Sequence, residues 1–305
     1  MKVVPMTEPS QTEMRRALLA GLSGYLIWGI SPLYFQLVSF ASALEIVGHR
    51  VLWSLPLLFC ALWFAGKRKQ AFAALADRRV LLTLIATAFL ISINWLVFVY
   101  AVNTDRILHA SLGYYINPLM SVAVGVVVLR EPLGPWRITA IVLATLGVLN
   151  LIISVGEVPW ISLVLAFSFT AYGYLRKVAA VDGRIGLFWE TAFVLPFALI
   201  ALVWLQMNGD GHFLQSPAEA GLLILAGVIT IVPLLLYIIG ARGLRLSTMG
   251  LLQFTAPTLQ FSIGLLRGEP FTPAYMVTFG FIWAGVAAFA WSQLRRDRLA
   301  VATKA

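Results

Sequence analysis

The sequence is short of charge and of cysteine. Only 11% of its 305 residues are Asp, Glu, Lys or Arg, against about 25% in average soluble domains. A chain with so little charge and 60% hydrophobic residues is not an ordinary soluble enzyme, a disordered protein or a nucleic-acid binder. The one cysteine, Cys60, excludes an internal disulfide and any cysteine-based zinc or iron–sulfur site. Because Cys60 lies inside an apolar run, we expect a buried, unreactive thiol.

The motifs of several enzyme classes are missing as well. The chain has no Walker loop, so ATP-driven activity would need another chain, and it has no dinucleotide fingerprint or GxSxG nucleophile elbow. Its three histidines do not have the spacing of a zinc motif. We therefore predict no cofactor and no metal. The net charge of +9 comes from basic residues between apolar runs, so we expect their partner to be the lipid bilayer and not nucleic acid.

Ten apolar runs are long enough to cross a membrane. A hydrocarbon core of about 30 Å needs roughly 20 apolar residues in a helix, and the backbone there must be helical because lipid offers it no hydrogen bonds. The first run follows Arg15 and Arg16, but it is longer than the roughly 7–15 apolar residues of a signal peptide, so we expect it to be retained. The predicted spans are 17–38, 44–65, 80–102, 108–129, 136–153, 159–177, 185–205, 219–240, 247–266 and 272–293.

The basic residues predict the orientation of these spans. Cytoplasmic loops carry an excess of Lys and Arg. With the N-terminus in the cytoplasm, all but three of the 22 Lys and Arg residues fall in the tails or in cytoplasmic loops, and the exceptions are Arg50, Arg106 and Arg267. We therefore predict ten transmembrane helices with both termini in the cytoplasm, including a tail over 1–16 and a basic tail over 294–305.

The two halves of the chain resemble each other. The segment from Glu131 to Val148 shares two prolines, a glutamate, a glycine and a valine with the segment from Glu269 to Val286. Five spans per half is an odd number, so the second half would enter the membrane upside down, as in many secondary transporters. We predict a first five-helix repeat over 17–153 and an inverted second repeat over 154–293.

Short motifs in the first half are similar to those of a known family. They are Tyr25-Leu26-Ile27-Trp28-Gly29 with Pro32, His49-Arg50 with Trp53-Ser54, Asn94-Trp95, Tyr100-Ala101-Val102-Asn103, Ser111-Leu112-Gly113-Tyr114-Tyr115-Ile116-Asn117-Pro118 and Glu131. With these residues the chain resembles the EamA-type transporters of the drug/metabolite transporter superfamily, and within them the RarD group of chloramphenicol-sensitivity proteins. The resemblance implies an all-α integral membrane protein with ten helices, in two inverted repeats around a central cavity.

Ionisable residues inside the predicted spans are candidates for function, because each costs about 2.5–3.5 kcal/mol at a span centre. Glu45 and His49 are four residues apart and share one face of the second span, where they would bind substrate or exchange a proton. The alternative places Glu45 at the outer headgroups. Arg50 points about 100° away from His49, and either lines the path or forms a structural pair. Glu190, in the seventh span, either mirrors this role or locks helices together.

Other polar and aromatic residues share helix faces at depth. Trp28 belongs to a face of the first span that either lines a cavity or packs helices through Gly29. Tyr114 and Asn117 lie beside Pro118, whose missing N–H leaves a carbonyl free. The substrate or coupling candidates are Glu45, His49, Arg50, Trp28, Asn94, Tyr114, Asn117, Glu190 and Gln253, and the expected hinge or kink positions are Pro32, Pro118 and Pro257. Asn94 and Gln253 either join a polar ring or bond between helices. Glu131 and Glu269 are expected to cap the helix that follows each of them.

These features predict a secondary transporter in a bacterial inner membrane. It would move a small organic metabolite or drug-like molecule by alternating access, with or without proton coupling. Two alternatives stay open at this point, an intramembrane enzyme acting on a lipid-linked substrate and a non-transporting accessory protein. The sequence leaves the substrate, the direction of transport and the oligomeric state open.

Overall fold

The computed structural model describes residues 11–129, 135–156, 158–179, 181–244 and 246–302, and their regular structure is entirely helical. The helices are α1 (Gln11–Leu37), α2 (Ala43–Phe64), α3 (Arg68–Ala74), α4 (Arg78–Asn103), α5 (Ile107–Leu129), α6 (Pro135–Val155), α7 (Trp160–Val178), α8 (Gly183–Met207), α9 (Pro217–Gly243), α10 (Leu246–Leu252), α11 (Thr255–Leu266) and α12 (Pro273–Ala302).

The predicted runs coincide with helices, but α1 begins at Gln11 and α12 ends at Ala302, so both extend into the predicted tails. Two further differences lie inside the chain. The short helix α3 lies in the loop after the second run, where no helix was expected. The ninth run was expected to be one helix, but it is broken at Gln253 and Phe254 between α10 and α11. Pro257 explains the break, because it has no N–H to offer the carbonyl of Gln253 four residues earlier.

Several helices begin at a serine or aspartate whose side chain caps the first turn. Ser42 accepts a hydrogen bond from the backbone N–H of Glu45 at 3.2 Å, and Ser216 does the same for Glu219. Asp77 and Asp182 accept from backbone N–H groups at the starts of α4 and α8. Serine and aspartate are preferred at this position because their oxygens satisfy free N–H groups of the first turn.

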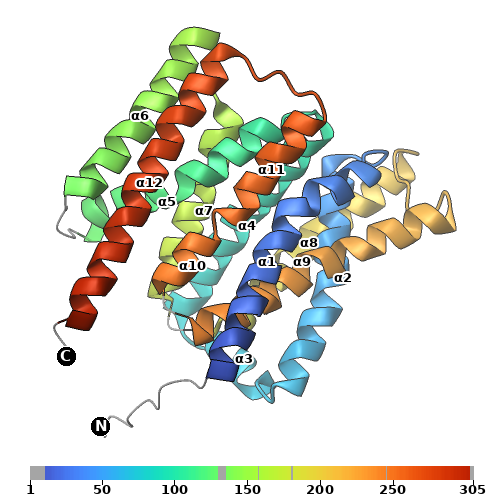
Figure 1. Ribbon diagram of the computed structural model, residues 1–305. Coiled ribbons are helices and arrows are strands. Elements are labelled where there is room, and N and C mark those ends of the chain that lie inside the picture. Colours follow the sequence, from blue (N-terminus) through green and yellow to red (C-terminus); the bar gives the residue numbers. More distant parts are fainter. Residues whose placement is uncertain (1–10, 130–134, 157, 180, 245, 303–305) are drawn as a thin grey trace, which may run out of the picture.

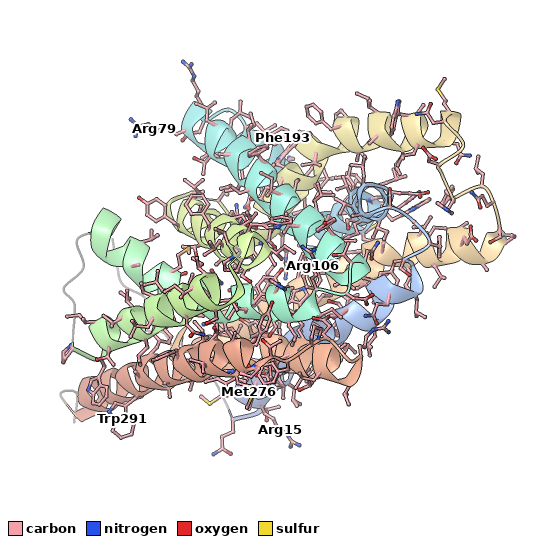
Figure 2. The ribbon with its side chains drawn as sticks, turned by 90° about the horizontal axis from the view of Figure 1, so that it is seen from above. Arg15, Arg79, Arg106, Phe193, Met276 and Trp291 are labelled. Carbon is pink, nitrogen blue, oxygen red and sulfur yellow. The ribbon has the colours of Figure 1, made fainter. Side chains whose placement is uncertain are left out.

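The outer surface of the helix bundle is apolar. Phe64, Met207 and Leu266 are each more than four-fifths exposed, and Met276 and Trp291 project from the rim of the bundle in Figure 2. In the described part of the chain, six helices are long and apolar enough to span a membrane, and the apolar helix Ile138–Ser154 is shorter. Such a surface suits lipid, so the chain is a multi-pass membrane protein.

Cys60 is exposed on this surface, so the expectation of a buried thiol was wrong. An apolar run does not distinguish a side chain that faces the protein core from one that faces lipid.

The helices pack in pairs that join the two halves of the chain. α6 lies along α12, and α1 begins at the same end of the bundle at which α12 ends (Figure 1). The best-packed pairs are α6 with α12, α1 with α9, α2 with α8, α5 with α7, α2 with α9, α4 with α7, α1 with α11, α5 with α11 and α4 with α8. Glycine permits the closest of these crossings, since a Cβ on Gly240 of α9 would lie 2.7 Å from the Cα of Gly21 on α1.

Candidate functional site

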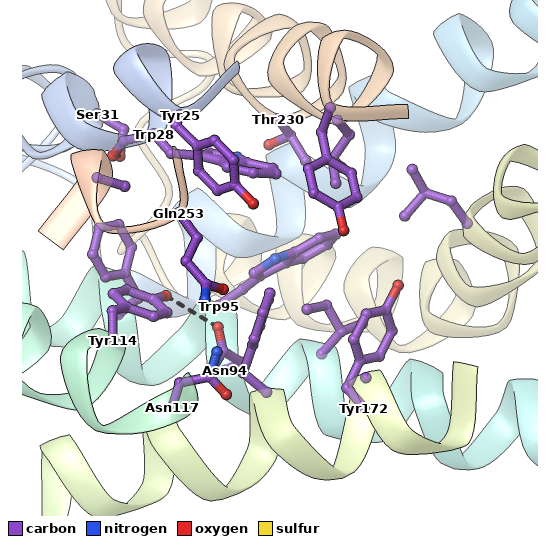
Figure 3. Close-up of a pocket in the computed structure, with 18 of the residues that line it drawn as sticks. Tyr25, Trp28, Ser31, Asn94, Trp95, Tyr114, Asn117, Tyr172, Thr230 and Gln253 are labelled. Atoms are coloured by element: carbon purple, nitrogen blue, oxygen red, sulfur yellow. Dashed lines mark hydrogen bonds between the residues drawn. The ribbon is translucent and has the colours of Figure 1, made fainter. Parts of the chain in front are cut away.

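A cavity of about 510 Å³ lies at the centre of the bundle. It is lined by helices from both halves of the chain, and Figure 3 shows its aromatic and amide side chains converging from α1, α4, α5, α7 and α9. Of the residues predicted from the sequence, it includes Trp28, Arg50, Asn94, Tyr114, Asn117, Gln253 and Pro257. A volume of this size fits a small organic molecule.

Arg50 is the buried cation of this cavity, with an exposed fraction of 7%. Its Nε donates to Oγ1 of Thr230 at 2.9 Å. Its guanidinium lies 4.6 Å from the ring centroid of Trp95 and 5.1 Å from that of Phe35. Within the described residues, Nη1 has no hydrogen-bond partner and no carboxylate forms an ion pair with the side chain. The cation is therefore held in place but not neutralised.

Asn94 both lines the cavity and joins helices, so the two roles expected for it coincide. Its Nδ2 donates to the carbonyl of Leu165 at 3.1 Å and to Oγ of Ser168 at 3.0 Å, both on α7. Its Oδ1 accepts from the hydroxyl of Tyr114 at 3.1 Å (Figure 3). One amide therefore fixes α4 against α5 and α7, and it sets the position of the Tyr114 ring.

Asn117 makes a similar link on the next turn of α5. Its Oδ1 accepts from Oγ1 of Thr170 on α7 at 2.7 Å. Pro118, the next residue, lies inside a helix that continues without a break, as Pro32 does in α1. Of the three prolines expected to be hinges, only Pro257 lies just after a break between two helices, in the first turn of α11.

The face of α1 that contains Trp28 and Gly29 was expected either to line a cavity or to pack against another helix, and it does both. Tyr25 and Trp28 line the cavity and contact each other with ring centroids 5.5 Å apart. Gly29 packs against α11, where a Cβ would lie 2.8 Å from Cβ of Leu259. Gln253 faces the cavity from the break between α10 and α11.

Glu45 and His49 lie outside the cavity lining, on the contact between α2 and the α8–α9 loop. The Glu45 carboxylate accepts from the backbone N–H of His212 at 2.6 Å and lies 2.9 Å from Nδ1 of the same residue. His49 stacks on Phe213, with centroids 4.7 Å apart, and accepts from Nε1 of Trp53. Glu45 is 1% exposed, so its side chain contacts the protein and not the solvent or lipid around it.

Glu190 also lies outside the cavity lining, and its carboxylate joins three helices. It accepts from the hydroxyls of Thr87 on α4 at 2.7 Å and Tyr172 on α7 at 3.1 Å. It also pairs with Arg176, with Nε 3.5 Å from Oε1. These are the contacts expected of a lock between helices.

Glu269 caps a helix, but not the one that follows it. Its two carboxylate oxygens accept from the backbone N–H groups of Ile107 at 2.6 Å and Leu108 at 2.8 Å, the first residues of α5. The expectation of a cap on α12 was wrong, because spacing along the chain does not reveal which helix end folds back against a turn. Burial raises the pKa of the Glu269 carboxyl, and the two N–H groups act in the opposite direction. Glu131 lies outside the described residues.

Most of the aromatic wall of the cavity was not predicted from the sequence. Phe35 and Trp95 hold Arg50 from α1 and α4, and Tyr172 and Tyr237 line the cavity from α7 and α9. Trp95 belongs to the Asn94-Trp95 motif. Because tryptophan is common at membrane interfaces and in helix packing, the sequence did not predict that Trp95 lies beside Arg50.

The cavity combines aromatic rings, amides and one buried cation, which can bind a ligand. The described residues contain no group of three His, Cys, Asp or Glu side chains that could hold a metal ion. An apolar-surfaced bundle of helices around a mixed aromatic and polar cavity is the architecture of a membrane transporter.

Comparison with known proteins gives the family. Residues 15–153 match the EamA-like transporter family. The chain is 38% identical over 294 residues to an uncharacterized transporter of Vibrio cholerae, covering 96% of this chain and 97% of that protein. It is 38% identical over 288 residues to the protein RarD of Escherichia coli, covering 94% and 97%. The chain belongs to the EamA-like transporter family, in its RarD-like group.

The fold is also found among solved structures. A crystal structure of a protein 16% identical to this chain aligns with a TM-score of 0.57, covering 89% of this chain and 96% of that one. At this identity the likeness concerns the fold alone.

Proposed function

We propose that the protein is a secondary transporter of the bacterial inner membrane, with no enzymatic activity of its own, that moves a small organic molecule by alternating access. The observation that carries the proposal is the central cavity, which is enclosed by helices of both halves and surrounded by an apolar outer surface. The lipid bilayer is its permanent partner. The substrate would bind between the halves, near the level of Arg50.

The packing of the helices supports two inverted five-helix repeats. Pairing the first five long helices with the second five in order makes α1 equivalent to α7, α2 to α8, α4 to α9, α5 to α10–α11 and α6 to α12. Exchanging equivalent helices turns the pair α1–α9 into α7–α4, and the pair α5–α7 into α11–α1. Both products are also well-packed pairs. Halves that pack interchangeably can exchange conformations, as alternating access requires.

The cavity supports an inward-facing state. Its lining reaches Arg176, Val181 and Gly183, at the α7–α8 turn, which the distribution of basic residues assigns to the cytoplasm. The opposite end is closed by contacts such as Tyr34 to the carbonyl of Leu222 at 2.8 Å and Glu45 to His212. In the outward-facing state these contacts would separate.

Flux through liposomes tests the proposal. The purified protein is reconstituted and screened for uptake or counterflow of a broad set of labelled metabolites, with protein-free liposomes as the control. We expect saturable flux of at least one compound, and its absence across the whole set contradicts the proposal. Turnover of lipid-linked substrates in the same liposomes would instead indicate an enzyme.

Proton coupling is a separate part of the proposal. Either His49 or Glu45 would exchange the proton, from the contact between α2 and the α8–α9 loop. Flux of the wild-type protein and of His49→Gln is compared from pH 5 to pH 8. We expect the variant to lose transport or its pH dependence, whereas an unchanged pH profile removes His49 from the mechanism.

A further inference from the structure

Two arginines line the cavity, and their partners differ. Arg176 lies 3.5 Å from the carboxylate of Glu190, which balances its charge. Arg50 is buried more deeply in the bundle and forms no ion pair with a carboxylate of the described residues, whereas Nη1 lacks a hydrogen-bond partner in both arginines. Removing an arginine from water is costly unless an anion compensates it. The anion that would compensate Arg50 is thus absent from its surroundings.

The neighbours of Arg50 orient its guanidinium and leave it charged. Trp95 and Phe35 contact it through their rings, and Thr230 accepts a hydrogen bond from Nε. Ring faces and a neutral hydroxyl attract a cation but carry no negative charge. Because Nε is occupied, a ligand would bind the Nη groups, of which Nη1 is buried and has no hydrogen-bond partner. A guanidinium fixed in this way is suited to binding a planar carboxylate with parallel hydrogen bonds.

The remaining lining of the cavity favours the same charge. No Asp or Glu is among the described lining residues, which include Arg50 and Arg176 and a wall of aromatic rings with Tyr25, Trp28 and Tyr114. A cationic or zwitterionic ligand would find no carboxylate here for its positive group. Aromatic and apolar walls suit a ligand with a hydrocarbon body.

We infer that the substrate is a small organic monocarboxylate, whose carboxylate pairs with Arg50 and whose apolar or aromatic body lies against the ring-lined wall. The inference rests on the proposed transport function. One uncompensated cation matches one negative charge, so a monocarboxylate fits better than a phosphate ester or an amino acid.

Pairs of ligands that differ only in charge test this inference. Benzoate, 3-phenylpropionate and hexanoate are each compared with their own amide, and with benzylamine as a cation, by calorimetry on the full-length protein in lipid nanodiscs. Empty nanodiscs correct for partition into lipid. We expect at least one carboxylate to bind about 10-fold or more tighter than its amide, because a charge-assisted hydrogen bond is roughly twice as strong as a neutral one. Equal binding of acid and amide, or no binding of any carboxylate, overturns the inference.

Variants assign the effect to Arg50. Arg50→Gln should remove the preference for the carboxylate, and Arg50→Lys should keep part of it. Arg267→Gln is the control, because Arg267 is a partly exposed arginine outside the cavity lining. If Arg50→Gln does not fold, the wild-type comparison of acids with amides still decides. A preference that persists in a folded Arg50→Gln protein overturns the assignment.

The liposome screen separates failure of this inference from failure of the proposed function. Wild-type flux of neutral or cationic metabolites, with no flux of carboxylates, overturns the substrate class and leaves the transporter intact. No flux of any compound contradicts both.

Discussion

Gly147 on α6 packs against the backbone carbonyl of Thr278 on α12, so closely that a Cβ on Gly147 would lie 3.1 Å from that oxygen. A reciprocal contact joins Gly285 on α12 to the carbonyl of Ala140 on α6, at 3.0 Å. In the two similar segments, Gly147 is equivalent to Gly285 and Ala140 to Thr278. Reciprocal contacts between equivalent residues are what a two-fold axis between the two proposed repeats would produce. The contact of Ala140 with Gly285 lies nearer the start of α6 and nearer the end of α12 than the contact of Gly147 with Thr278 does. The two helices therefore run antiparallel, as the proposed inverted repeats require.

The first prediction concerns this crossing. Gly285→Leu places a side chain against a helix backbone that cannot move aside easily, and we expect it to destabilise the protein by about 1–3 kcal/mol, as overpacking does. Gly280→Leu is the matched control on the same helix, because a Cβ there meets nothing within 4 Å. Thermal unfolding in detergent measures both. Equal melting temperatures for the two variants would show that α6 and α12 do not depend on this close contact.

The second prediction concerns sidedness. Arg68 and Arg106 are both exposed, and the distribution of basic residues assigns Arg68 to the cytoplasm and Arg106 to the outside. Because Cys60 is itself exposed, it is first replaced by serine. We expect an impermeant maleimide added to intact cells to label Arg106→Cys and not Arg68→Cys, and opened cells to show labelling of both. Labelling of Arg68→Cys in intact cells would reverse the topology and the assignment of an inward-facing state.

The sequence is sufficient to predict the helices because lipid imposes one strong rule. Every spanning backbone must be helical, so a run of apolar residues predicts both the element and its length. The rule failed at Gln253, where one apolar run contains two helices. Hydropathy does not show that the carbonyl of Gln253 lacks a hydrogen-bond donor because Pro257 has no N–H.

The site could be predicted only in part, because contacts between distant segments build it. Arg50 was conspicuous as a cation inside a span, but Phe35, Trp95 and Thr230 come from three other helices. Glu45 was equally conspicuous, yet its partner lies in a loop 167 residues away. Helical periodicity predicts which side chains share a face of one helix. It contains no information about which segment covers that face.

The third prediction concerns the cap on α5. Glu269→Gln keeps the size of the side chain but leaves only one acceptor oxygen for two backbone N–H groups, and its NH₂ group would face the second of them. We expect a loss of about 1–3 kcal/mol, the cost of an unsatisfied buried donor. Asp105→Asn is the control, since this exposed residue pairs with Arg267 only at 3.9 Å, at a surface. A Glu269→Gln protein as stable as Asp105→Asn would mean that the cap contributes little.

The fourth prediction concerns the contact between Glu45 and His212, which closes the cavity on its predicted outer side. Glu45→Gln removes the negative charge that strengthens the hydrogen bonds to the backbone N–H and the ring of His212, so we expect the outward-facing state to gain population. The reporter is Ser31→Cys, at a buried position in the cavity lining, in the Cys60→Ser background. An impermeant thiol reagent added outside intact cells should label this cysteine several times faster when Glu45→Gln is present.

The control for this experiment is Asp210→Asn, an exposed acidic residue of the same α8–α9 loop. The Ser31→Cys reporter should be labelled at the same rate with and without Asp210→Asn, because this substitution removes a charge without disturbing the contact of Glu45 with His212. His212→Gln provides a second test from the opposite side of the contact, and it should accelerate labelling as Glu45→Gln does. If both Glu45→Gln and His212→Gln leave the rate unchanged, the α2 contact with the loop does not control access, and the other contact at this end, from Tyr34 to the carbonyl of Leu222, is the next to test.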